Sequence, residues 1–386
     1  MKKYRVLFLL LIITFVFASC SSASRTVESE SFDAAIFVVA GNATSYVICS
    51  NNYLWGWGSN RVGQIGNGQR LHHDYPQITH TRILDNVIYV SANGQLQRSR
   101  TGSHVLAIRD DNSLWAWGEN STGQVGVVFP PPHQLEPVFV MDNVAAVSAG
   151  GAHSMAIGLD GSLWVWGDNS WGQLGNGTIG NVSATPVKIM EDVMAASAGV
   201  FHSAAITSDG DLWVWGANPL GQIGDGTTYG RIAPTRVKSD VVAISLGLHF
   251  TLAITSNSEL WAWGSNTDGI LGDGVEMYNA IPIKLMDDIS YISAGHSFAL
   301  AIDTNDVLWA WGNNDVGQLG DGTTISRNTP VKIMEDIAYV SVGGWISTAY
   351  AFAIDNSGAL WAWGDNFLAQ LGDGTMTSSN VPVRVR

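Results

Sequence analysis

Histidine residues recur in this chain at an interval that could serve metal chemistry. His104, His153 and His202 follow one another in equal steps of 49 residues, and imidazole nitrogen is a common ligand for zinc. The aligned column runs through the other units as Thr44, Phe250, Phe298 and Tyr350. Equivalent positions of a repeat need not converge within a ligand distance of about 2 Å. Because aromatic residues replace histidine in this column, we interpret it as packing and predict no metal site.

Aspartate residues between two glycines raise the same question for calcium. They are Asp225, Asp273, Asp321 and Asp373. A calcium loop supplies six or more oxygen ligands, with acidic residues at alternating positions. One aspartate per turn falls short of that set, and Asn67 and Asn176 replace it in two other copies. We interpret these residues as turn formers.

Other catalytic motifs are missing from the sequence. It contains no nucleophile elbow, no phosphate-binding loop of the Walker type and no HExxH zinc helix. The carboxylates are numerous, but no pairing can be established from their spacing. The sequence therefore predicts a protein that is not an enzyme, with no catalytic residues and no cofactor.

The elements that must position these residues repeat along the chain. The pattern Trp-x-Trp-Gly occurs seven times, and successive copies lie 60, 49, 49, 48, 48 and 52 residues apart. The pairs are Trp55 and Trp57, Trp115 and Trp117, Trp164 and Trp166, Trp213 and Trp215, Trp261 and Trp263, Trp309 and Trp311, and Trp361 and Trp363. Such a period marks a repeat architecture in which each unit packs against its neighbours.

The fourth unit shows what one repeat should form. Short apolar runs at 193–198, 202–207 and 211–216, followed by 234–238, predict four strands. Gly210 provides the positive φ of the turn before the third strand. Pro234 is expected at the start of the fourth strand, where a missing N–H is tolerated.

The third strand of each unit predicts how the units stack. Side chains two residues apart share a face of a strand, so both Trp residues of a pair point one way. The small residues between them face the other way: Gly56, Ala116, Val165, Val214, Ala262, Ala310 and Ala362. Large and small faces of neighbouring sheets interlock, which predicts an all-β, seven-bladed β-propeller over residues 34–386. An open solenoid would need polar capping units, and we recognise none.

The combined pattern resembles the regulator of chromosome condensation repeat family. In the third unit the matching segments are Val147–Gly150, His153, Asp160–Trp164, Trp166–Gly167 and Gly172–Gly175. This resemblance covers about residues 34–386 and likewise implies a seven-bladed propeller. Departures from the motif lie at 93–102, 127–133 and 345–349, and at Ile270 and Ala369.

Aromatic residues in the variable connections are the candidate partner-binding residues. They are Trp171, Phe367, Tyr229, Tyr278, Phe129 and Trp345. Tyr and Trp are favoured as anchors because they supply large, stiff contact areas. The alternative is that each of them packs against its own blade.

The first residues read as a targeting segment. A basic stretch precedes an apolar run at 6–18, which is short for a membrane span and typical of a signal peptide. Residues 17–20 resemble the lipobox of bacterial lipoproteins, with Phe17 where that motif usually has Leu. We therefore expect a signal peptide at 1–19, a lipidated Cys20 and a flexible tether at 20–33. A secreted protein with an incidental Cys20 is the alternative, and Cys49 is expected in the core.

Charge and location limit the partners. The net charge is −14, and residues 1–19 carry three positive charges and no negative one, so cleavage would leave −17. Nucleic acid is disfavoured as a partner. We expect a monomeric, extracytoplasmic, membrane-tethered scaffold, at the cell surface or in the periplasm, that binds a protein or a cell-envelope component. Resemblance also leaves open a β-lactamase inhibitor and, by analogy with the family's namesake, a guanine-nucleotide exchange factor.

Overall fold

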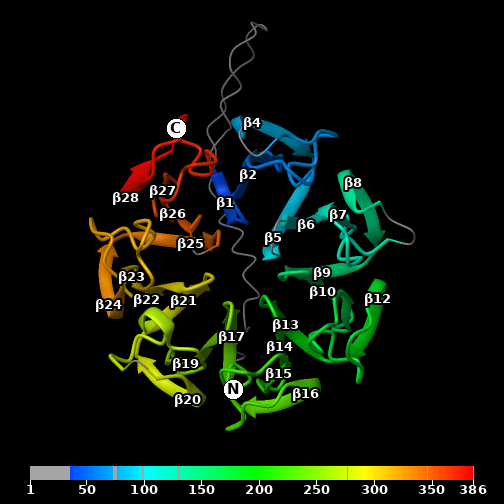
Figure 1. Cartoon of the computed structure of the whole chain (residues 1–386), viewed down its shortest axis with the longest axis vertical. Coiled ribbons are helices and arrows are strands. Elements are labelled where there is room, and N and C mark those ends of the chain that lie inside the picture. Colours follow the sequence, from blue (N-terminus) through cyan, green and yellow to red (C-terminus); the bar gives the residue numbers. More distant parts are fainter. Residues whose placement is uncertain are drawn as a thin grey trace, which may run out of the picture.

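The strands form a closed ring of small sheets. The computed structural model describes residues 35–72, 76–97, 100–127, 131–275, 277–345 and 347–385. Within these ranges 28 strands make seven four-stranded antiparallel sheets, arranged as the blades of a propeller (Figure 1). The predicted fold class is therefore confirmed. None of the helical segments in the described ranges has the length and apolar character needed to cross a membrane.

Each blade is built from four consecutive strands. Blade 1 contains β1 (Ala35–Ala40), β2 (Thr44–Cys49), β3 (Leu54–Gly58) and β4 (Gln77–Leu84). Blade 2 contains β5 (Val87–Gln97), β6 (Arg100–Arg109), β7 (Leu114–Glu119) and β8 (His133–Met141). Blade 3 contains β9 (Val144–Ala149), β10 (His153–Gly158), β11 (Leu163–Gly167) and β12 (Ser183–Met190). Blade 4 contains β13 (Val193–Ala198), β14 (His202–Thr207), β15 (Leu212–Gly216) and β16 (Arg231–Lys238).

The remaining three blades follow the same order. Blade 5 contains β17 (Val241–Leu246), β18 (Phe250–Thr255), β19 (Leu260–Gly264), the short 3-10 turn η1 (Thr267–Gly269) and β20 (Asn279–Met286). Blade 6 contains β21 (Ile289–Ala294), β22 (Phe298–Asp303), β23 (Leu308–Gly312) and β24 (Arg327–Met334). Blade 7 contains β25 (Ile337–Gly343), β26 (Tyr350–Asp355), β27 (Leu360–Gly364) and β28 (Ser379–Arg384).

The strand predictions for the fourth unit are confirmed for its first three strands. The fourth strand begins three residues earlier than predicted, at Arg231, so Pro234 lies inside β16 and not at its start. The register of β16 on β15 shifts between the pairs Val214–Thr235 and Gly216–Arg231. Pro234 lies next to this irregularity on the outermost strand, where an absent N–H breaks no regular ladder bond.

The up-and-down strand order gives the ring two different faces. Connections from first to second strands and from third to fourth strands leave on one face, which we call the loop face. Connections from second to third strands and between blades lie on the opposite face, which we call the turn face. The long glycine-rich loops therefore share the loop face with the short turns that surround the axis.

Tryptophan joins each blade to the one before it. The second Trp of every pair is fully buried and packs against small residues of the preceding blade, as Trp263 does against Ala204 and Val214. Its indole N–H donates to a loop carbonyl of that blade over 2.7–3.0 Å: Trp57 to Gln370, Trp117 to Gln64, Trp166 to Gln124, Trp215 to Gln173, Trp263 to Gln222, Trp311 to Ile270 and Trp363 to Gln318. The predicted interlocking of large and small faces is therefore observed.

Serine residues of the innermost strands add a second set of links between blades. Each hydroxyl oxygen accepts a backbone N–H from the next blade, over 2.9–3.3 Å. The pairs are Ser91 with Ala149, Ser148 with Ala198, Ser245 with Ala294, Ser293 with Val342 and Ser341 with Ala40. The serine of the repeat motif thus connects the blades around the axis.

The first and last blades close the ring through the same contacts. Figure 1 shows β1 beside blade 7, and Gln370 of blade 7 accepts the indole N–H of Trp57. Tyr350 also donates its hydroxyl proton to the carbonyl of Thr44 over 2.8 Å. The two ends of the repeat array therefore meet, which closes the predicted propeller. Cys49 lies fully buried in β2, which agrees with the predicted core position.

The close approach of a loop to the next tryptophan leads to a first prediction. A Cβ added to Gly175 would lie 2.5 Å from Nε1 of Trp215, and Gly175 has φ +66°. We expect Gly175→Ala to lower the free energy of unfolding by about 3 kcal/mol, through backbone strain and overpacking. Urea unfolding measures this loss.

The chain contains a matched control in the same loop. Gly177 has φ +81°, and an added Cβ there would meet nothing within 4 Å. Gly177→Ala should therefore lower the free energy of unfolding by only about 1 kcal/mol, from backbone strain alone. Equal losses for the two variants would show that the contact with Trp215 is unimportant.

Candidate binding face

Two side chains shape each glycine-rich loop. A buried Asn after the third strand accepts the backbone N–H five residues later, over 2.8–3.1 Å, in all seven blades. The Gln of the motif accepts the N–H two residues before it in six blades, as Gln173 does from Trp171. These bonds fix the backbone of the loop, and most of the side chains before the loop glycine are exposed or half-exposed, although Val62 is buried. The repeat motif thus holds variable residues on a rigid support.

Four of the predicted binding residues lie exposed on the loop face. The exposed fractions are 51% for Trp171, 74% for Tyr229, 50% for Tyr278 and 68% for Phe367. Other exposed apolar residues of these loops are Ile179, Val182, Val275, Met277, Ile325 and Met376. Among the described loop residues, all the large exposed apolar side chains come from blades 3 to 7. The structure therefore places the candidate anchors on one face, along an arc of five blades.

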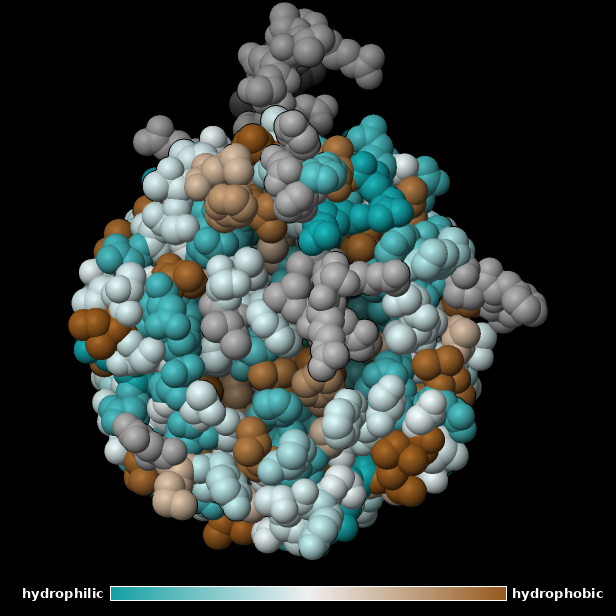
Figure 2. All heavy atoms as spheres, viewed as in Figure 1, coloured by the Kyte–Doolittle hydropathy of each residue, from teal (hydrophilic) through white to brown (hydrophobic). Residues whose placement is uncertain are grey.

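The remaining predicted residues have different positions. Trp345 lies on the loop face beside the axis. It is half-buried, unlike the four exposed residues, because it packs against His296 with ring centroids 3.6 Å apart. Phe129 and Cys20 lie outside the described residues. On the face drawn in Figure 2, hydrophobic residues form separate patches between hydrophilic ones. That face carries no continuous apolar area within the described part of the chain.

The three aligned histidines link blades to one another. Nε2 of His104 lies 2.8 Å from Oγ of Ser154, which donates its own proton to the carbonyl of Gln124. His153 with Ser203 at 2.8 Å, and His202 with Thr251 at 3.1 Å, repeat this arrangement. Because the hydroxyl proton is already used, each imidazole donates from Nε2. The prediction that this column packs is confirmed.

Burial keeps these histidines neutral. It lowers the pKa of His104 to about 3, with a further contribution from the charge of His153. It lowers the pKa of His153 to about 4 against an opposing effect of Asp168. The pKa of His202 falls to about 3 through burial and then through the charges of His249 and His153. No group of three His, Cys, Asp or Glu side chains suited to a metal occurs in the described ranges.

The aspartates of the glycine-rich loops act as turn formers. Asp321 accepts the N–H and the hydroxyl proton of Thr323 over 2.9 and 2.7 Å and pairs with Arg327. Burial by itself would raise the pKa of Asp321, but the bonds from Thr323 and Arg327 outweigh it and lower the pKa. Asp225 makes the same contacts with Thr227 and Arg231. These contacts support the reading of the aspartates as structural.

A second group of ring side chains surrounds the axis on the loop face. Phe201 stacks on His249 with centroids 5.5 Å apart, and Trp171 meets Phe201 edge-on at 6.1 Å. His296 and Trp345 continue this group on the turns of blades 6 and 7. The sequence analysis missed Phe201, His249 and His296. The available signal for Phe201 and His249 was their place one residue before the column of His104, where the other blades have Ala or Ser. The position of His296, two residues before that column, varies from blade to blade and gives no such signal.

The fold and the loop face define the class of this protein. It is a seven-bladed propeller of the kind that serves as a scaffold for protein interactions, with rigid loops that present variable side chains. The chain belongs to the RCC1-like domain family, since the model of that family matches residues 20–349. The predicted family resemblance is therefore confirmed.

Sequence relatives match only part of the chain. Mouse protein RCC2 is 32% identical over 105 residues, which is 25% of this chain and 19% of RCC2. The ultraviolet-B receptor UVR8 of Arabidopsis thaliana is 31% identical over 80 residues, 21% of this chain and 16% of the receptor. The matching segment thus spans about a fifth of these relatives.

Solved structures match over most of the ring. Human WBSCR16 superposes with a TM-score of 0.75 at 22% identity, covering 86% of this chain and 94% of that one. Prp20p of Saccharomyces cerevisiae, described with its binding to Gsp1p and histones, gives 0.72 at 19% identity, with 86% and 85% covered. At these identities the likeness shows the fold alone.

Proposed function

We propose that this protein is a membrane-tethered, extracytoplasmic scaffold that binds a partner protein on its loop face. The observation that carries the proposal is the arc of exposed aromatic and aliphatic side chains on rigid loops of blades 3 to 7. Exposed Trp and Tyr are costly in water and are enriched where proteins bind. The loops that present them are held by their Asn and Gln side chains, so binding would order little backbone.

Charge narrows the kind of partner. The chain has a net charge of −14, and Asp268 and Asp315 are exposed on the loop face between the aromatic loops of blades 4 and 7. A partner with Lys or Arg around an apolar centre would complement this surface. The association rate should then fall as salt is added.

The test is loss of binding by a double variant of the loop face. We expect Trp171→Ala with Phe367→Ala to weaken partner binding by at least about 100-fold, because truncation of an aromatic anchor typically costs 1–2 kcal/mol or more. Affinity capture from the producer's envelope and culture proteins identifies the partner, and titration with the purified partner measures the change.

A control variant lies on the opposite face. Leu159 is 58% exposed in the turn between β10 and β11, so Leu159→Ala removes a comparable apolar side chain from the turn face. Binding should survive this change. Loss of binding in Leu159→Ala, or its retention in the double variant, would contradict a binding site on the loop face.

The tether gives an independent prediction. Lipidation of Cys20 should place the protein in the membrane fraction, since more than one acyl chain provides stable attachment. We expect Cys20→Ser to abolish incorporation of labelled fatty acid and to release the protein from membranes. A secreted wild-type protein with no label would contradict the anchor and leave the binding proposal intact.

Two narrower functions use the same face. A β-lactamase inhibitor would bind its target through the loop aromatics, so wild type should inhibit the enzyme and the double variant should not. Guanine-nucleotide exchange has support only from resemblance to the family, and the binding of Gsp1p is a property of Prp20p. If the labelling of Cys20 confirms that the chain is exported, that export argues against nucleotide exchange.

A further inference from the structure

The axis of the propeller opens on the loop face into a small pocket. Its volume is about 60 Å³, which is room for only a few water-sized groups. Six of the residues that line it carry aliphatic side chains: Ala40, Ala92, Val200, Leu246, Ala294 and Val342. Nearer the turn face, the rings of Phe37, Tyr89, Tyr291 and Tyr339 occupy the axis, with neighbouring centroids 5.0–5.2 Å apart. These rings therefore bound the pocket on the side of the turn face.

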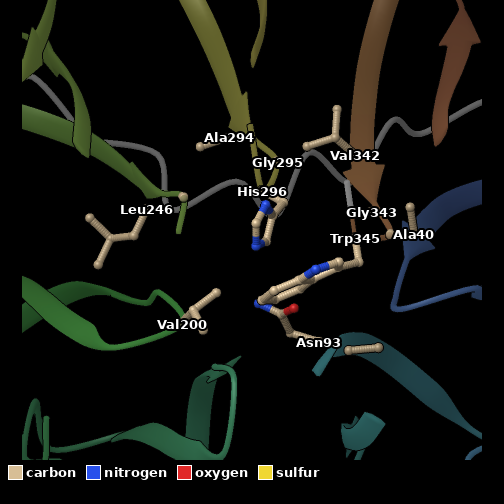
Figure 3. Close-up of a pocket in the computed structure, with 13 residues that line it drawn as sticks. Ala40, Asn93, Val200, Leu246, Ala294, Gly295, His296, Val342, Gly343 and Trp345 are labelled. Atoms are coloured by element: carbon tan, nitrogen blue, oxygen red, sulfur yellow. The ribbon is translucent and has the colours of Figure 1, made fainter. Parts of the chain in front are cut away.

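One buried polar side chain in this pocket has no partner. His296 is 7% exposed, and neither of its ring nitrogens forms a hydrogen bond within the described part of the chain. Figure 3 shows its imidazole projecting into the opening. Buried polar groups are nearly always satisfied, because leaving one unpaired is costly. We therefore expect the pocket to bind a group that can donate a hydrogen bond to this imidazole or accept one from it.

Trp345 supplies a flat surface next to that imidazole. Its ring centroid lies 3.6 Å from that of His296, and Figure 3 shows the amide of Asn93 on the other side of the indole. These three side chains come from blades 6, 7 and 2. The pocket thus joins one planar apolar surface to hydrogen-bonding groups.

The lining excludes a charged occupant. Among the lining residues that the structure describes, none is Asp, Glu, Lys or Arg. Burial, together with the charge of His249, lowers the pKa of His296 to about 3, so the imidazole is neutral at pH 7. A buried charge without a partner carries a high cost.

We propose that the axial pocket receives one uncharged carboxamide, the side chain of an Asn or Gln on a loop of the bound protein. A carboxamide has both a donor and an acceptor for the imidazole. It is planar, so it can lie against the indole of Trp345, and it is small enough for the volume. This inference rests on the proposed function, because it assumes a protein on the loop face.

The probe is a capped amino acid, N-acetylglutamine methylamide. The full mature chain carries ¹⁵N in histidine and tryptophan, and the His296 and Trp345 signals are assigned from His296→Ala and Trp345→Phe. We expect the probe to shift both signals saturably, whereas N-acetylleucine methylamide and N-acetylglutamate methylamide do not. In His296→Ala the Trp345 signal should report binding about tenfold weaker, with an unchanged unfolding midpoint.

Contrary results separate the two proposals. The absence of a saturable shift, or an equal shift with the leucine compound, would overturn the inference and show a pocket filled by water only. If the glutamine compound binds but the Trp171 and Phe367 double variant keeps its partner, the proposed binding site on the outer loops is refuted and the pocket inference is kept. If that variant loses its partner and the probe fails to bind, the proposed scaffold function is kept and the pocket inference is refuted.

Discussion

Replacing Trp57 by Ala is expected to lower the free energy of unfolding by about 4 kcal/mol. The side chain is fully buried between the first and last blades, and loss of a buried Trp ring costs 3–5 kcal/mol. Gln370 keeps a donor after the change, because Ser45 also donates to its carbonyl over 2.6 Å. The loss therefore comes mainly from the cavity. Urea unfolding measures it, and amide exchange should rise first in blades 1 and 7.

Two variants control for this result. Trp57→Phe removes the indole N–H but keeps most of the ring, so it should cost much less than Trp57→Ala. Trp171→Ala makes the same chemical change at an exposed site and should cost less than about 1 kcal/mol. A small effect of Trp57→Ala would mean that the blades close the ring without this contact.

Acidification from pH 7 to pH 5 is the second large effect, and it should destabilise the ring. His104, His153, His202 and His296 have pKa values lowered from 6.5 to about 3 or 4 by burial. The unfolded chain binds protons below pH 6.5 while the folded chain does not. Stability is therefore full above pH 6.5 and falls as the pH drops towards the folded values.

The size of the effect follows from linkage. Each such histidine contributes about 1.4 kcal/mol per pH unit inside that window, so at pH 5 the cost is about 2 kcal/mol per histidine. Aspartates with lowered pKa values, such as Asp225 and Asp321, lose their contribution only at lower pH. The pH dependence between 6.5 and 5 should thus report the histidines.

The chain itself suggests the variant that tests this. Blades 5 and 6 place Phe250 and Phe298 where earlier blades have histidine. His80 and His249 also have pKa values lowered by burial and add to the slope. We therefore expect His153→Phe with His202→Phe to reduce the slope of stability against pH by about a third, measured by urea unfolding at several pH values. An unchanged slope, or a wild-type stability that does not fall by pH 5, would contradict the assignment.

Most of the architecture could be predicted because it repeats. The Trp pairs, the small residues between them and the turn glycines each appear many times, so local propensity and packing agree. The start of β16 was misjudged because Pro234 was read as a boundary, whereas the bulge beside it lets the strand continue. Repetition corrects many local ambiguities, but it does not reveal a register shift.

The candidate site was predictable only in part. Trp171, Tyr229, Tyr278 and Phe367 were identified because they are aromatic residues in variable connections, and the structure places them on one face. The axial pocket depends on residues from six different blades, and the sequence does not show that they meet. His296 matters because of its distance to Trp345, and that distance depends on the ring as a whole.

The direction of β1 has a consequence for orientation. This strand begins at Ala35 on the turn face and runs towards the loop face, so the segment before it joins the ring on the turn face. If Cys20 holds the chain in a bilayer, that attachment reaches the ring at the turn-face end of β1. The ring would then stand with its turn face towards the lipid and its loops pointing outwards. With that attachment, a partner on the loop face would approach from the side away from the membrane.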